Sequence, residues 1–101
     1  MSILALISTS VTLVNTVTVT ATEKTISIPA GTKQLFIKLR DASVSWVYSF
    51  TATGTTTLYR TVPAGGELQL TNLQLHSQTG LKLYVSQSSG GDLVLEQEYW
   101  K

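Results

Sequence analysis

The chain has 101 residues, of which 43% are hydrophobic and only 13% are charged, and it contains no cysteine. A chain of this length forms one domain around a single core, and the lack of cysteine excludes disulfide staples and thiolate chemistry. Seven basic and six acidic residues give a net charge of +1. Without a basic excess to meet a phosphate backbone, nucleic acid is not an expected partner.

Hydroxyl residues supply much of the polar character. The sequence holds 16 Thr and 11 Ser, whereas the charged share is about half that of a typical soluble domain. A lightly charged surface repels neighbouring molecules weakly. The composition therefore favours a protein that packs against copies of itself or against a larger assembly.

The N-terminal region begins with an apolar run, ILALI, at residues 3–7. No Lys or Arg precedes it and hydroxyl residues soon follow, whereas a secretory signal has a positive start and about 7–15 unbroken apolar residues. No stretch approaches the roughly 18 apolar residues of a membrane span, so a membrane is not expected as a partner. We expect residues 1–24 to form a strand or an arm, with Ile3, Leu4 and Leu6 as candidate contacts to a neighbouring subunit.

Alternation of apolar and polar residues with a period of two recurs along the chain, and no helical period is found. The expected strands are residues 16–20, 25–28, 35–40, 43–51, 56–62, 67–70, 81–86 and 92–100. The breakers between them include Pro-Ala-Gly segments, since Pro cannot donate to a ladder and Gly permits positive φ. About eight strands predict one all-β domain, an antiparallel β-sandwich or jelly roll with residues 25–101 as its body. The pattern leaves the strand order undetermined and a barrel open.

The third expected strand separates a core face from an outer face. Leu35, Ile37 and Leu39 share one side of it. Lys38 and Arg40 alternate with them, and so mark the other side as solvent or interface. We expect this outer side to be a candidate contact surface.

Aromatic residues divide between the core and the surface. Trp46, Tyr48 and Phe50 share one face of the fourth strand, which predicts that this strand lies at the centre of the core. Tyr84 alternates with apolar neighbours and is a candidate for the outer surface. Two further aromatics, Tyr99 and Trp100, lie on opposite faces of the last strand, so at least one is exposed unless a partner covers it.

Residues that support catalysis or metal binding are sparse. His76 is the single histidine, and no G-x-S-x-G motif accompanies it, so we expect it to have no catalytic role. One histidine and no cysteine do not complete a zinc site. Glu96 and Glu98 are the only acids on a shared strand face; they are too few for calcium and typical of a solvated edge strand. We expect no catalytic residues, no metal and no cofactor.

Four sequence features follow one another along residues 25–101. They are ISIPAG at 26–31, IKLR at 37–40 with VSWVYSF at 44–50, VPAG at 62–65, and LKLYVS at 81–86 leading to VLE at 94–96. In this cadence the chain resembles small phage virion proteins, a class built as β-sandwiches and encoded among head and tail genes. The resemblance implies a non-enzymatic capsid decoration, cement or head–tail accessory subunit, made in the host cytoplasm and carried in the virion. It also implies a homo-oligomer, with a trimer favoured, that binds a major capsid or tail protein.

Two other hypotheses stay open. The first is a carbohydrate-binding or receptor-binding β-sandwich module that stacks a sugar on Tyr84 or Trp100. The second is a small secreted enzyme or adhesin, which requires cleavage near residue 20.

Overall fold

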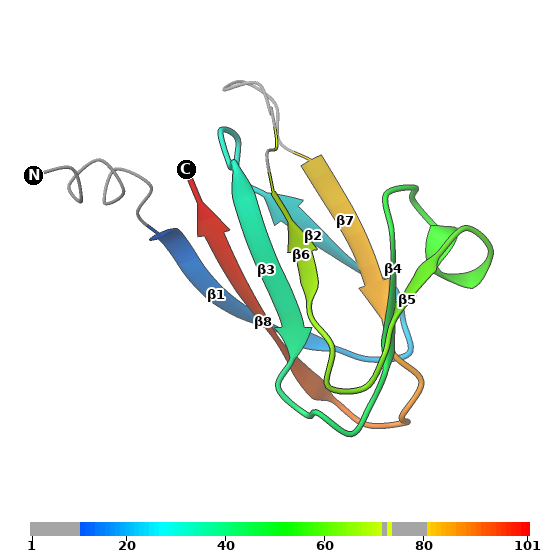
Figure 1. Cartoon of the computed structure of the whole chain (residues 1–101). Helices are drawn as coiled ribbons and strands as arrows, with labels where there is room; N and C mark the ends of the chain where they lie inside the picture. The colour runs from blue at the N-terminus through cyan, green and yellow to red at the C-terminus, as the bar shows by residue number, and fades with distance from the viewer. Residues whose placement is uncertain (1–10, 72, 74–80) are drawn as a thin grey trace, which may run out of the picture.

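The computed structural model describes residues 11–71, 73 and 81–101. The strands are β1 (Val11–Val19), β2 (Lys24–Ile28), β3 (Gln34–Leu39), β4 (Trp46–Ser49), β5 (Arg60–Val62), β6 (Leu68–Leu70), β7 (Leu81–Ser86) and β8 (Leu93–Trp100). A short 3-10 helix, η1 (Gly54–Thr56), lies between β4 and β5, and the described residues contain no α-helix (Figure 1). The all-β prediction is confirmed.

The strands form two four-stranded sheets. Sheet A has the order β1-β8-β3-β6 and sheet B has the order β2-β7-β4-β5, and every neighbouring pair is antiparallel. The pairing is nested, because β1 joins β8, β2 joins β7, β3 joins β6 and β4 joins β5. This is a long hairpin rolled into two layers, the jelly-roll arrangement. The predicted sandwich or jelly roll is confirmed, and the alternative of a barrel is not.

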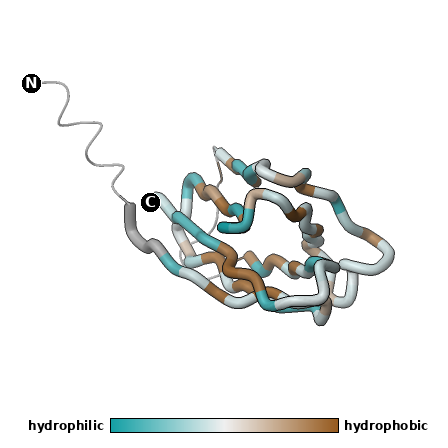
Figure 2. Tube along the Cα trace, turned by 90° about the horizontal axis from the view of Figure 1, so that it is seen from below, coloured by the Kyte–Doolittle hydropathy of each residue, from teal (hydrophilic) through white to brown (hydrophobic). Residues whose placement is uncertain are grey.

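The core lies between the two sheets. Figure 2 shows both layers from below, with hydrophobic segments along the strands of each. Every one of the eight strands contributes to the buried hydrophobic residues, which are Val19, Ile26, Ile28, Leu35, Ile37, Leu39, Trp46, Val62, Leu68, Leu83, Val85, Leu95 and Tyr99. The predicted inward register of the third strand is confirmed, since Leu35, Ile37 and Leu39 are all buried.

The fourth strand is shorter than predicted. It ends at Ser49, and its aromatic face is buried only in part: Trp46 is 1% exposed, whereas Phe50 is 47% exposed. The chain leaves the sheet after Ser49 and enters a loop at residues 50–59. Phe50 therefore does not belong to the core, contrary to the alternation that placed it there.

The loop at residues 50–59 replaces the expected start of the fifth strand. Thr53 adopts the left-handed conformation with φ 61°, and Gly54 and Thr55 are buried. The carboxylate of Glu23, in the β1–β2 connection, accepts hydrogen bonds from the Thr53 amide at 2.7 Å and from the Thr55 hydroxyl at 2.7 Å. The Glu23 carboxylate thus holds the loop in place through Thr53 and Thr55. As a result, β5 begins only at Arg60.

The N-terminal strand starts earlier than predicted. β1 covers Val11–Val19 and pairs with β8, so this part of the expected N-terminal strand or arm belongs to sheet A. The candidate contacts Ile3, Leu4 and Leu6, and the single histidine His76, lie outside the described residues.

Candidate functional site

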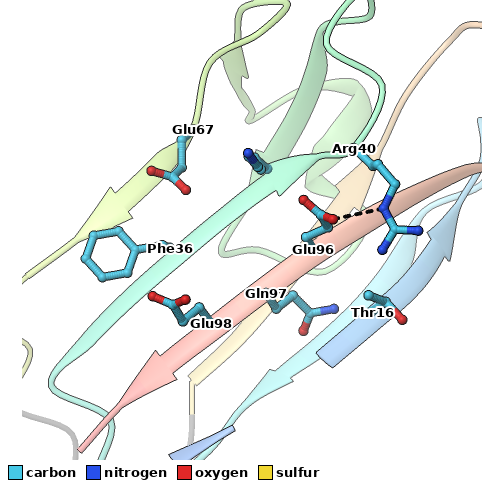
Figure 3. A pocket seen from close by; sticks show the side chains of 8 residues that line it. Thr16, Phe36, Arg40, Glu67, Glu96, Gln97 and Glu98 are labelled. Atoms are coloured by element: carbon cyan, nitrogen blue, oxygen red, sulfur yellow. Dashed lines mark hydrogen bonds and ion pairs between the residues drawn. The ribbon is translucent and has the colours of Figure 1, made fainter. Parts of the chain in front are cut away.

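The outer side of sheet A gathers most of the charged and aromatic candidates. We call it the charged face and define it by Phe36, Lys38, Arg40, Glu67, Glu96, Glu98 and Trp100. Six of these seven residues, all but Trp100, line an open groove of about 300 Å³. Figure 3 shows Phe36 between Glu67 and Glu98, and Arg40 joined to Glu96. The sequence placed Lys38 and Arg40 on one outer side and named Trp100 separately, and the fold brings the three to one face.

Cross-strand pairing between β3 and β8 builds this face. Lys38 lies opposite Glu96, and Phe36 lies opposite Glu98. Since side chains alternate across a strand, the residues between them point into the core. Burial of Leu35, Ile37 and Leu39 fixes the orientation of β3. Its outward charged and aromatic side chains are consequently held next to those of β8.

Each carboxylate of the charged face accepts a hydrogen bond from another side chain. Arg40 Nε donates to Glu96 Oε2 at 2.8 Å in an ion pair. Trp100 Nε1 donates to Glu98 Oε1, and Gln69 Nε2 donates to Glu67 Oε1, both at 2.8 Å. The bond from Trp100 restrains the indole ring, which is half-buried. The face therefore presents ordered polar groups around two aromatic rings.

The position of β8 corrects one expectation. Glu96 and Glu98 were expected on a solvated edge strand, but β8 lies between β1 and β3 inside sheet A. The nested pairing of the jelly roll inserts the last strand between the first and the third. The two carboxylates are thus in the middle of a face.

The other two tyrosine candidates lie elsewhere. Tyr99 is fully buried in the core, and its hydroxyl donates to Gln97 Oε1 at 2.5 Å. Burial raises the pKa of Tyr99 to about 12. As a core residue, Tyr99 is not part of an exposed contact surface. Tyr84 is half-buried on the outer side of sheet B, opposite Thr25 on β2 and Ser49 on β4.

A second groove lies beside the 50–59 loop, and the sequence did not single it out. It has a volume of about 340 Å³, and its exposed lining includes Tyr59, Ser45, Thr56 and Ser88. The exposed aromatic residue in it is Tyr59, at 48%. The signal in the sequence was weak, since only the path of the loop brings Tyr59 next to these hydroxyl groups.

Neither groove has the composition of a metal centre. In the part of the chain that the structure describes, no three His, Cys, Asp or Glu residues are grouped so that they could hold an ion. Over the same residues, no helix has the length and apolar character needed to cross a membrane. Comparison with protein-family models, with curated proteins and with solved structures gives no match to this chain.

Proposed function

We propose that the chain is a non-enzymatic structural subunit that binds a larger virion assembly through its charged face. The observation that carries the proposal is the composition of that face. Trp100, Phe36 and Arg40 are of residue types enriched in protein interfaces, and Trp and Arg are also enriched among energetic hot spots. They share one side of a four-stranded sheet with carboxylates and an ammonium group.

The order of these side chains supports a role in binding. The Trp100 indole is held by Glu98, and the Arg40 guanidinium is held by Glu96. Groups that are already restrained lose less conformational entropy on association than free ones. A partner surface of complementary charge would then be oriented by the alternating signs along the face.

The choice of partner comes from the resemblance of the strand-and-turn cadence to small phage virion proteins. In such an assembly, many symmetric copies each contribute a modest interface, and avidity makes the whole attachment tight. A major capsid or tail protein encoded beside this chain is the partner that we propose.

Co-expression with the neighbouring head and tail proteins, followed by co-purification and affinity measurement, tests the proposal. We expect Trp100→Ala and Arg40→Ala to weaken binding by about tenfold or more, as for hot-spot residues. The matched controls are Tyr84→Ala and Lys82→Ala on the outer side of sheet B, which should bind as the parent does. Absence of binding by the parent chain, or equal losses in the controls, would contradict the proposal.

A second candidate function is glycan binding at the groove beside the 50–59 loop. Exposed Tyr59 there lies among hydroxyl side chains, and an aromatic ring with a few polar groups is a usual arrangement for ligand recognition. Glycan-array binding that Tyr59→Ala abolishes and Trp100→Ala preserves would favour this function. The reverse result would place a sugar platform on the charged face.

A further inference from the structure

The four edge strands of the sandwich differ in how they are protected. β5 and β6 have three residues each, and β2 has five and begins with a lysine. β1 has nine residues, VTLVNTVTV, with no charge and no proline. Natural sheets usually shorten an edge or place Lys or Pro on it, because its unpaired backbone groups can pair with another chain. β1 is the exception among the four.

A β-bulge also protects edges, and β1 contains an irregularity between Val11 and Leu13. From Leu13 to Val19 its register with β8 is continuous. The irregularity therefore affects only the first residues and leaves a regular stretch long enough to pair.

One hydrogen bond shows which backbone groups point to the free edge. The Thr16 amide donates to the Asn15 side-chain oxygen at 2.9 Å, so it is directed away from β8. Backbone groups alternate in direction along an antiparallel strand. The amides and carbonyls of Val14, Thr16 and Thr18 therefore face the open edge, where the side chain of Asn15 satisfies one donor in the single chain.

We propose that a second copy of this chain pairs antiparallel along β1, with the twofold axis at Thr16. Thr16 then lies opposite Thr16 of the other copy, and Val14 lies opposite Thr18. Each of these residues exchanges backbone hydrogen bonds with its counterpart, and Asn15 releases the Thr16 amide. The two copies of sheet A become one continuous sheet.

The charge distribution favours a second copy as the occupant. Across the twofold axis Thr16 meets its own copy, and the flanking residues meet other residues of the same strand. A charged edge would therefore repel itself, and β1 has no charge. The nearest acid on β8, Glu96 opposite Thr16, is already paired with Arg40. Thr16 is exposed and meets Thr16 of the other copy, and Thr–Thr pairs are favourable across strands.

The pairing gives a twofold dimer instead of the trimer that the resemblance favours. It does not depend on the proposed function, because the charged face remains open. Both copies of that face lie on the same side of the joined sheet, since directly opposite residues in antiparallel strands share a side.

Sedimentation equilibrium of the full chain from micromolar to millimolar concentration tests the proposal. We expect a monomer–dimer equilibrium, and Thr16→Lys should raise the dissociation constant by about tenfold or more, because like charges meet at the axis. The matched control is Thr25→Lys, which changes an exposed threonine on edge strand β2 and should leave the dimer unchanged.

Thr16→Pro provides an independent variant. It removes only the edge-directed amide, so the β1–β8 ladder and the circular dichroism spectrum should persist while the dimer is lost. Hydrogen exchange should show protection of the Thr16 amide that increases with protein concentration. A parent chain that stays monomeric, a threefold mass, or a dimer that survives both Thr16 variants would overturn the proposal. Phe36→Ala, a charged-face change on β3 and so away from the dimer axis, should keep the dimer, and failure here is then distinct from failure of the charged face.

Discussion

The outer faces of both sheets consist of the side chains that alternate with buried ones, but the two faces differ in composition. The outer side of sheet A has acids, Lys38, Arg40 and Phe36 around an open groove, with Trp100 beside Glu98. The outer side of sheet B has mainly hydroxyl residues around Tyr84, and the 50–59 loop packs over one end of it through Gly54 and Ser49. Burial constrains the inward residues of both sheets equally. The outward residues are free to differ, so one sheet carries an open charged face while part of the other is covered by the 50–59 loop.

The core common to both sheets should show the largest effect. Trp46 is 1% exposed, and Trp46→Ala should lower the free energy of unfolding by about 3–5 kcal/mol, as a large-to-small core change. Urea unfolding measures this.

Trp46→Phe separates the contribution of the aromatic ring from the cost of its unpaired indole donor. Among the described residues the Trp46 indole nitrogen is buried without a hydrogen-bond partner. Phe removes this unpaired donor and keeps most of the ring, so it should cost clearly less than Ala. Equal stability of the parent and the Ala variant would refute the inward register of β4.

The covered end of sheet B depends on a close approach at Gly54. A Cβ added there would lie 2.2 Å from Ser49 Oγ and 2.9 Å from Ser49 Cβ. Gly54→Ala should therefore destabilise the protein by about 1–3 kcal/mol, as overpacking does. Gly91→Ala is the control, because no atom lies within 4 Å of its added Cβ, and it should stay within about 0.5 kcal/mol of the parent. Similar unfolding midpoints for the two variants would show that the loop does not press on sheet B.

Acid should loosen the same loop. The Thr55 hydroxyl, together with the Thr55 and Thr53 amides, lowers the pKa of Glu23 below its ordinary value of 4.5, against a smaller opposing effect of desolvation. A depressed folded pKa means that the stabilisation is present above the unfolded pKa and is lost as pH falls through the folded pKa.

Glu23→Gln should therefore flatten the loss of stability between neutral pH and about pH 3. Thr55→Val, which removes the hydroxyl donor, should raise the Glu23 pKa toward its ordinary value in an NMR titration. An unchanged titration in Thr55→Val would contradict the role given to that hydroxyl.

The smallest effect on stability is expected on the charged face. The Arg40 and Glu96 side chains are 60% and 34% exposed, and an exposed ion pair contributes about 0–1 kcal/mol. Arg40→Ala should thus change unfolding little while it weakens binding to the partner. A double-mutant cycle with Glu96→Ala measures the pair directly. A large coupling energy for folding would assign this face to stability rather than to contact.

Several expectations from the sequence hold in the structure because they rest on local alternation. The bounds of β7 match the prediction, and the inward register of β3 is the one read from the sequence. The aromatic fourth strand failed at Phe50, because periodicity does not report where a chain leaves its sheet. The 50–59 loop was missed for a related reason, since Glu23 holds it from 30 residues away.

For this protein, the sequence by itself determined an all-β domain of about eight strands, the buried face of β3 and the outward position of Lys38 and Arg40. Only the tertiary structure decided that β8 lies inside sheet A, that Trp100 shares a face with Lys38 and Arg40, and that β1 is a long, uncharged edge. The physical reason is the range of the interactions. Alternation is a property of neighbouring residues, whereas strand order follows from pairing between segments as distant as Val11 and Trp100.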